Sequence, residues 1–363
     1  MSHDEEEIER LKVENIKLFE ELKRKKAKLT STLKELEEKN FQLAAHHRDL
    51  TDSVNYAKRI QMAIMPPRYV VNKLLEESFI LYLPKDVVSG DFYFVHRIKD
   101  EVVFAVVDCT GHGVPGALMS VVGFNCLDQA VSKLNMTVPC EILSFLDEGV
   151  NDTLRQTADE SGVKDGMDLA MCTFNAKKKE LQYSGAYNPL YVIKKVESFV
   201  SKKERKIDVE HPREIKKQLV KASKEKAGVE VSVVTKNENN HWIGGVEEVI
   251  NHPAMSLGDH HLFEIKADKL PIGVNLDGVV DIYTNHTVPV EKGDAIYLFT
   301  DGYADQFGGP MEKKFKYHRL KELLLSIQDK TMIEQKRILV RTFSKWKGDE
   351  DQIDDVLVMG LRV

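Results

Sequence analysis

Several features that define common protein classes are scarce or missing in this sequence. The 363 residues contain four cysteines, Cys109, Cys126, Cys140 and Cys172, with no CxxC spacing and no histidine pair at the spacing of a zinc site. A disulfide framework or a structural zinc site is therefore not expected. We expect the cysteines to be buried reduced thiols. No run approaches the roughly 20 apolar residues that a membrane-spanning helix needs, and the start MSHDEEEIER lacks the regions of a signal peptide.

Charge and composition narrow the class further. A formal net charge of −6 offers no electrostatic basis for binding nucleic acid. With 42% hydrophobic and 30% charged residues, the chain is typical of a globular protein with a highly charged portion. We expect it to be cytoplasmic, either by itself or as the soluble part of a longer membrane-bound sensor, with no membrane segment of its own.

The N-terminal region lacks glycine and proline from residue 5 to about residue 60. Leucines recur there every seven residues, which is the spacing of a coiled-coil seam: Leu22, Leu29, Leu36, Leu43 and Leu50. The companion seam is mixed, since it includes Lys26, Asn40 and His47. We predict a marginal coiled coil and linker helix over residues 1–65 that forms a homodimer. A solvated charged helix packed on its own domain is the alternative.

Pro66-Pro67 ends this helix, because proline lacks the amide donor that a helix interior requires. The pattern beyond it predicts strands at 79–83, 92–98, 102–108, 169–176, 180–186, 189–195, 286–290, 295–301 and 356–363, and helices at about 114–134, 139–158, 317–328 and 331–346. Short linkers favour antiparallel neighbours, and strands segregated from paired helices predict an α+β layered domain over 66–363. A lysine- and glutamate-rich segment at about 197–266 is expected to be an inserted subdomain or flap.

The end of the N-terminal helix has an apolar face of its own. Ala57, Ile60, Ala63 and Ile64 lie at i, i+3, i+6 and i+7, a spacing that places them on one side of a helix. We expect this face to pack on the following domain.

Four aspartates share a similar setting, each beside the end of a predicted strand: Asp91, Asp108, Asp301 and Asp354. Rigid strands could bring these carboxylates from distant parts of the chain to one site. Carboxylates packed together repel one another, and a hard divalent cation compensates their charge. An oxygen-only set suits Mg²⁺ or Mn²⁺ better than Zn²⁺. One aspartate alone would more often belong to a turn.

The stretch VVDCTGHGVPG, residues 106–116, is rich in glycine and could serve other chemistry. Its glycines match the spacing of a phosphate-binding loop, but Ala117 and Leu118 stand where that loop needs lysine and serine or threonine. His112 could act as a general base or serve only for its hydrogen bonds. No GxSxG signature of a serine hydrolase occurs.

The ordered set of motifs resembles the PPM-type metal-dependent serine/threonine protein phosphatases, in their bacterial SpoIIE-like or RsbU-like branch. The matching stretches cover about 55–363 apart from the insertion: AKRIQMAIMPP, PKDVVSGDFYFV, VVDCTGHGVPGALMS, MDLAMCTF, YSGAYNPLYVI, KLPIGV, YLFTDGYADQFGGP and QIDDVLVMGLRV. The resemblance implies an αββα sandwich with two divalent cations, Mn²⁺ or Mg²⁺, and hydrolysis of phosphoserine or phosphothreonine by metal-activated water.

Residue by residue, the resemblance makes Asp91, Asp108, Asp301 and Asp354 metal ligands, with Asp108 bridging and Asp91 and Asp108 at the catalytic centre. It adds the carbonyl of Cys109, where relatives often carry glycine. Residues that the resemblance places beside the site are Gly90, Gly111, His112, Gly302 and Asp355. Relatives often have two glycines before the first aspartate, where this chain has Ser89-Gly90, and a further aspartate where it has Phe94.

The resemblance also implies partners. The expected substrate is a phosphoprotein of a bacterial signalling pathway, with a STAS-type anti-sigma-factor antagonist of a partner-switching system as the first candidate. The expected regulation comes from an upstream sensor module or protein and runs through the coiled coil. A catalytically weak, pseudophosphatase-like scaffold is the alternative from another class. A metallohydrolase for small phosphoesters is a third interpretation, but no small-molecule pocket can be read from the sequence.

Overall fold

The computed structural model describes residues 3–154, 165–195, 229–236, 242–250, 253–274 and 283–363. The chain divides into two compact units, Met1–Ala57 and Lys58–Val363.

The first unit belongs to one helix, α1, which runs from His3 to Ile64 and whose last seven residues belong to the second unit. Glu21 pairs with Lys25 at 2.8 Å and Glu35 with Lys39 at 3.0 Å, the i, i+4 arrangement that supports a solvated helix. The five heptad leucines are each between 53% and 67% exposed. Across the described residues, no helix combines the length and apolarity needed to cross a membrane.

The second unit is built on two antiparallel sheets. The first has the order β1-β15-β12-β6-β10-β9 and the second β2-β3-β4-β5-β11-β7-β8. The first sheet comprises β1 (Ser78–Leu83), β6 (Leu190–Lys195), β9 (Met255–Leu257), β10 (His260–Ile265), β12 (Ala295–Phe299) and β15 (Val356–Arg362). The second comprises β2 (Phe92–Ile98), β3 (Glu101–Cys109), β4 (Met167–Asn175), β5 (Glu180–Ala186), β7 (Val229–Lys236), β8 (Trp242–Ile250) and β11 (Asn285–Pro289).

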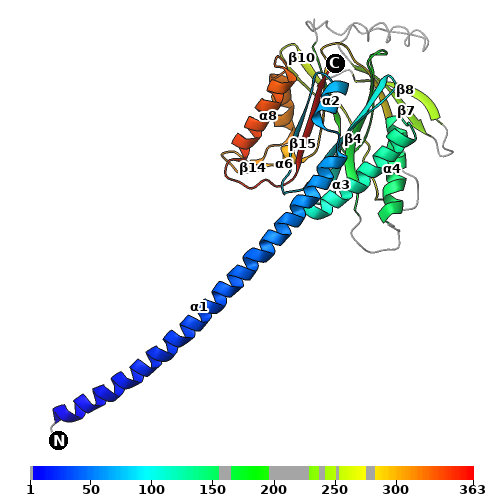
Figure 1. Cartoon of the computed structure of the whole chain (residues 1–363). Helices are drawn as coiled ribbons and strands as arrows, with labels where there is room; N and C mark the ends of the chain where they lie inside the picture. Colours follow the sequence, from blue (N-terminus) through cyan, green and yellow to red (C-terminus); the bar gives the residue numbers. More distant parts are fainter. Residues whose placement is uncertain (1–2, 155–164, 196–228, 237–241, 251–252, 275–282) are drawn as a thin grey trace, which may run out of the picture. The chain divides into compact units, whose positions relative to one another are not determined.

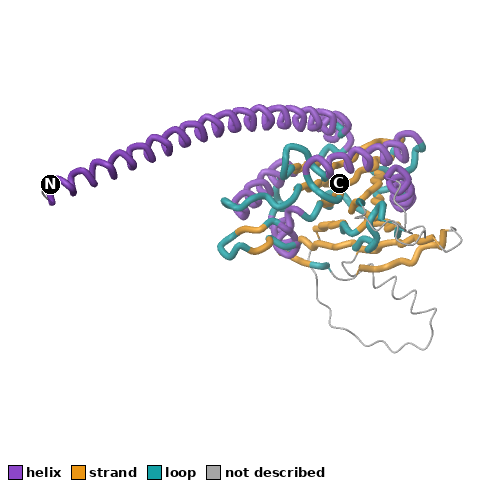
Figure 2. The backbone as a smooth tube through the Cα atoms, turned by 90° about the horizontal axis from the view of Figure 1, so that it is seen from below, coloured by secondary structure: helices purple, strands orange, loops and turns teal. Residues whose placement is uncertain are grey.

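Helices cover the outer face of each sheet, as Figures 1 and 2 show. On the second sheet they are α3 (Gly113–Asp128), which continues as a π-helical turn (Gln129–Lys133), and α4 (Pro139–Leu154); on the first sheet they are α7 (Tyr317–Ser326) and α8 (Met332–Lys347). The short α2 (Arg68–Leu74) contacts β1 and β2, and the short α6 (Gly302–Asp305) contacts α7 and β15. A two-stranded hairpin of β13 (Phe307–Gly308) and β14 (Lys313–Lys314) follows α6. The order of layers is therefore α7/α8, first sheet, second sheet, α3/α4. The expected αββα sandwich is confirmed.

Period-two alternation along the strands produces these layers. In β12, Tyr297 and Phe299 belong to the core beneath α7 and α8, whereas Ile296 and Leu298 belong to the larger core that includes the second sheet. Both faces of the strand are buried, so it reads as a continuous apolar run rather than as an alternating one.

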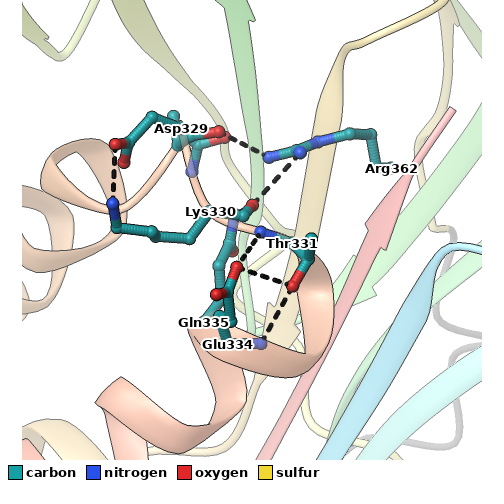
Figure 3. Close-up of polar contacts among 7 residues, drawn as sticks. Asp329, Lys330, Thr331, Glu334, Gln335 and Arg362 are labelled. Carbon is teal, nitrogen blue, oxygen red and sulfur yellow. Dashed lines mark hydrogen bonds and ion pairs between the residues drawn. The ribbon is translucent and has the colours of Figure 1, made fainter.

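The connection between α7 and α8 is fixed by polar contacts (Figure 3). Thr331 and Glu334 form a capping box at the start of α8, which satisfies amides that the first helical turn leaves free. Arg362, at the end of β15, donates to the carbonyl oxygens of Lys330 at 3.2 Å and Gln328 at 2.7 Å. The helical layer is thus tied to the sheet beneath it.

The segment expected as an insertion, 197–266, contributes strands to both sheets where it is described. β10 pairs with β6 and β9 in the first sheet, while β7 pairs with β11 and β8 in the second. Residues 196–228, 237–241 and 251–252 of this region lie outside the described residues.

The expected apolar packing face at the end of α1 is only partly buried. Ile60 is 49% exposed and Ala63 is exposed, whereas Ala57 and Ile64 are half-buried. Gln61, at 3% exposure, and Met65 occupy the buried positions. A polar side chain therefore occupies the buried position, because its hydrogen-bonding partners are there.

Candidate metal and active site

The four aspartates come from the ends of both sheets. Asp91 directly precedes β2, and Asp108 is the second-last residue of β3, which pairs with β2 in antiparallel register. Asp301 follows β12, and Asp354 precedes β15, which pairs with β12. Electrostatic interactions couple Asp91 to Asp108 and Asp354, and Asp108 to Asp301 and Asp354. The structure therefore brings the four predicted residues together.

Three glycines allow the two loops of the second sheet to approach closely. A Cβ on Gly90 would stand 2.5 Å from the carbonyl oxygen of Gly111, and one on Gly116 would stand 2.9 Å from the Cα of Gly90 and closer still to the Gly111 carbonyl. Gly111 has φ +80°, a conformation that favours glycine. The glycine-rich bend thus packs the first turn of α3 against the residue before Asp91.

Asp91 is buried at 2% exposure and held by defined partners. Its Oδ2 accepts a hydrogen bond of 2.7 Å from the hydroxyl of Thr300, and its amide donates to the Ser89 hydroxyl at 3.1 Å. The amide of Leu357 in β15 donates to the Thr300 hydroxyl at 3.0 Å. Thr300 therefore links Asp91, from one sheet, to two strands of the other.

Asp355 has a different role from its neighbour Asp354. Its two carboxylate oxygens accept from the amides of Lys85 at 2.7 Å and Gly90 at 2.8 Å, so it fixes the loop before Asp91. Gly302 gives room for this arrangement, because a Cβ there would collide with the Asp355 carbonyl. Asp354 accepts from the amide of Asp355 at 2.8 Å.

The acidic cluster shifts the pKa values of its members. Burial, followed by the charge of Asp108, raises the pKa of Asp91. Burial also raises the pKa of Asp108, together with Asp301, Asp354 and Asp168. The pKa of Asp301 is raised to about 6 by burial and by Asp354. Desolvation of like charges is the shared cause, and a bound cation would remove it.

Asp168 is a member of the cluster that sequence reasoning missed. It lies opposite Asp108 in the register of β3 and β4, and burial followed by Asp301 raises its pKa to about 6. Thr300 and Asp305 were missed as well; Asp305 raises the pKa of Asp301 and pairs with Lys314 at 2.7 Å. Asp168 carried one signal, since the stretch MDLAMCTF has a charged residue near the start of an otherwise buried strand.

The remaining predicted residues take distinct places. The carbonyl of Cys109 faces Gly90, at 3.2 Å from the position of a Cβ there, while burial raises the pKa of its thiol. His112 is the N-cap residue of α3, and its Nδ1 lies 2.7 Å from Oδ2 of Asp86. Both side chains are about half exposed, so this ion pair lies at the surface of the loop.

The chemistry of the donors fits a hard divalent cation: carboxylates that range from buried to exposed and repel one another, with a backbone carbonyl beside them. Within the described part of the chain, however, no group of three or more His, Cys, Asp or Glu side chains is arranged so that it could already hold a metal ion. The carboxylates interact electrostatically with one another, but their side chains are not close enough together to form a coordination shell.

Comparison with known proteins agrees with this architecture. The family model for Stage II sporulation protein E (SpoIIE) matches residues 250–363. The SiaA-PP2C domain of Pseudomonas aeruginosa is 27% identical, with a TM-score of 0.63 over 88% of this chain and 99% of that one. No curated protein matches the chain.

Two further solved structures are similar at lower scores. The RsbU and RsbW domains of Rv1364c from Mycobacterium tuberculosis are 18% identical, with a TM-score of 0.45 over 78% of this chain and 59% of theirs. The PP2C phosphatase domain and regulatory fragment of SpoIIE from Bacillus subtilis are 13% identical, with a TM-score of 0.46 over 79% of this chain and 63% of theirs.

The layered fold, the SpoIIE family model over residues 250–363 and the likeness to the SiaA-PP2C domain support a phosphatase of the PPM type. Within that class they support a SpoIIE-like protein serine/threonine phosphatase.

Proposed function

We propose that the chain hydrolyses phosphoserine or phosphothreonine on a protein substrate with two divalent cations, Mn²⁺ or Mg²⁺. One observation carries this proposal: four aspartates far apart in the sequence meet where the ends of the two sheets come together. Asp91 is buried, Asp108 and Asp301 are half-buried, and Asp354 is exposed. Burial and mutual repulsion raise the pKa values of Asp91, Asp108 and Asp301. Such a cluster is costly for a fold unless cations compensate its charge.

Each aspartate has a role in this scheme. Asp91, Asp108, Asp301 and Asp354 would hold the cations, and the Cys109 carbonyl would be the added ligand. When bound, such cations lower the pKa of water to near neutrality and neutralise phosphoryl oxygens. The hydroxyl of Thr300 holds one carboxylate oxygen of Asp91 in place by a hydrogen bond. The carboxylate of Asp355 holds the loop before Asp91 in place, because it accepts hydrogen bonds from backbone amides of that loop. Fixed ligands of this kind need no reorganisation when substrate binds.

Hydrolysis of p-nitrophenyl phosphate tests the chemistry. The full chain should hydrolyse it only when Mn²⁺ or Mg²⁺ is present, and Asp108→Asn should lower the rate at least about 100-fold, since the variant removes the bridging carboxylate. Asp152→Asn, on the exposed end of α4, is the matched control and should leave the rate unchanged. Retained activity in Asp108→Asn would overturn the assignment. A wild-type chain without activity would favour the scaffold alternative.

A second proposal concerns the identity of the protein substrate. From the resemblance, we propose a phosphorylated STAS-type protein of a partner-switching pathway as the substrate. Phosphoproteomics of cells that contain either the active chain or Asp108→Asn tests this proposal. Accumulation of a STAS-domain phosphosite only in the variant would support it, and accumulation on unrelated proteins alone would contradict it.

Regulation runs through α1 in this scheme. The coiled coil of α1 dimerises the chain, and its register biases the metal site between competent and incompetent states. A chain that begins at residue 66 should therefore differ from the full chain in activity and lose any response to dimerisation. Equal activity and equal response in both chains would show that α1 plays no part.

A further inference from the structure

The buried end of α1 is attached to the residues on both sides of Asp91. Gln61 contacts Ser89, two residues before this aspartate, and the carbonyl of Pro66 accepts a 3.0 Å hydrogen bond from the hydroxyl of Tyr93, two residues after it. All of these residues belong to the same compact unit. The short segment 61–66 therefore spans the site that holds Asp91.

The contact of Gln61 with Ser89 is a two-point backbone contact. Nε2 of Gln61 donates to the Ser89 carbonyl at 2.6 Å, and Oε1 accepts from the Ser89 amide at 3.2 Å. Nε2 also donates to the Ser120 hydroxyl in α3 at 2.8 Å. The carboxamide thus replaces the partners that a neighbouring strand would give to Ser89, and it connects three separate segments.

An apolar residue would be the simpler choice at this buried position. A buried amide is destabilising unless all its groups find partners, and Gln61, Ser89 and Ser120 are each at most 3% exposed. The apolar neighbours Ile60 and Ala63 point elsewhere, since they are exposed. The buried carboxamide of Gln61 fixes the position of Ser89, and therefore the position of Asp91 two residues later.

We propose that Gln61 is a positioning residue for the metal site: through its two hydrogen bonds to the Ser89 backbone, the end of α1 sets the place of Asp91. The inference rests on the proposed function, because it treats Asp91 as a metal ligand. It adds a specific contact through which any movement of α1 would reach the site.

The test uses the full chain and two measurements. Gln61→Met keeps the size of the side chain and removes its hydrogen bonds. Mn²⁺ affinity, measured by calorimetry, should weaken about tenfold, at the low end of the range for residues outside the ligand shell. Amide hydrogen exchange of residues 85–94, measured without metal, should become faster, because the Ser89 amide loses its acceptor. Gln42→Met, the same change at an exposed position of α1, should alter neither quantity.

Two further variants separate the contacts. Ser120→Ala removes the link from Gln61 to α3, together with the bond that the Ser120 hydroxyl donates to the Ala117 carbonyl within α3. It should weaken Mn²⁺ binding less than about threefold, because the two bonds to the Ser89 backbone remain. Tyr93→Phe removes the second attachment and should speed exchange in the same segment. If Gln61→Met does not fold, Gln61→Glu, which keeps an acceptor for the Ser89 amide, takes its place and should show the same direction of change.

The outcomes are distinguishable. If Gln61→Met lowers the melting temperature but leaves both Mn²⁺ affinity and exchange of residues 85–94 unchanged, Gln61 is only a core residue and the inference is wrong. If the wild-type chain binds no Mn²⁺, the proposed function fails, and the exchange measurement alone decides whether Gln61 positions the Asp91 segment.

Discussion

At the scale of single residues, the aspartates of the site oppose the stability of the fold that holds them. Asp108 interacts with Asp301, Asp354 and Asp168, and burial adds to the cost of its charge. In the metal-free chain at neutral pH, Asp108→Asn should therefore raise the free energy of unfolding by about 1 kcal/mol or more. An asparagine can still accept the hydrogen bond that Asp108 receives from the Asp301 backbone.

Thermal unfolding with and without Mn²⁺ checks this prediction. Asp108→Asn should melt about 2–4 °C above the wild type in chelator and should lose the increase in melting temperature that Mn²⁺ gives the wild type. Asp152→Asn should change neither value. A lower melting temperature for metal-free Asp108→Asn would show that repulsion from the neighbouring carboxylates does not outweigh the stabilising contacts of Asp108.

The pH dependence follows from two members of the cluster. Asp168 and Asp301 have pKa values of about 6 in the folded chain against an ordinary value of 3.8. Between about pH 4 and pH 6 the folded state therefore binds more protons than the unfolded state, so the stability of the metal-free chain should fall as pH rises through this window. Mn²⁺ needs deprotonated ligands, so its affinity should rise over about pH 5–7.

Urea unfolding in chelator, between about pH 4 and pH 7.5, and Mn²⁺ titrations, between about pH 5 and pH 7.5, measure the two trends. Asp168→Asn should make the fall in stability shallower, because it removes one of the carboxyls whose pKa is raised in the folded chain. A metal-free stability that increases from about pH 4 to pH 6 would contradict the prediction.

Residues differed in how well the sequence revealed them. Asp91, Asp108, Asp301 and Asp354 stand beside strand ends, where a carboxylate is conspicuous. Asp168 was missed because only the pairing register of β3 with β4 places it opposite Asp108. Gln61 was missed because helical periodicity predicts only apolar contacts. It cannot show that the buried backbone amide and carbonyl of Ser89 need hydrogen-bonding partners.

At the scale of elements, close packing of loops positions the aspartates that we propose as metal ligands. The first turn of α3 contains Gly116, where a Cβ would collide with the Gly111 carbonyl and stand 2.9 Å from the Cα of Gly90. Gly116→Ala must push α3 away from the loop that carries Asp91. It should lower the free energy of unfolding by about 1–3 kcal/mol and weaken Mn²⁺ binding about tenfold or more.

Gly258→Ala is the matched control for this prediction. Gly258 has φ +62° and no neighbouring atom within 4 Å of the added Cβ, so alanine there should cost about 1 kcal/mol through backbone strain and leave Mn²⁺ affinity unchanged. Equal effects of both variants on Mn²⁺ binding would show that the Gly90–Gly116 packing does not position the site.

Elements with strong local signals were the most predictable. The strands at 92–98 and 180–186 match β2 and β5, and α4 begins at Pro139 as expected. The partners of β10 could not be predicted, because β6 is about 70 residues away in the sequence and non-local pairing leaves no local pattern. The close contacts among glycines are likewise visible only once the loops are placed.

At the scale of the whole molecule, α1 exposes a stripe of leucines that does not belong to the core of the unit Lys58–Val363. In the single chain the heptad leucines of α1 are more than half exposed, although leucines at this spacing pack against a partner helix in a coiled coil. A second copy of the chain is the partner that we predict. Polar residues at the companion seam, such as Asn40 and His47, should make the dimer modest in affinity while fixing its register.

Analytical ultracentrifugation of the full chain tests for this dimer. The wild type should sediment as a dimer at micromolar concentration. Leu29, Leu36 and Leu43 changed together to alanine should weaken association at least about 100-fold, since each substitution removes a buried seam contact from both helices. Phe41, exposed on α1 away from both seams, gives the control: Phe41→Ala should remain dimeric. A wild type that is monomeric at about 100 µM, a concentration that corresponds to about −5.5 kcal/mol in association free energy, would leave the exposed leucines without a self-partner and would end the dimer model of regulation.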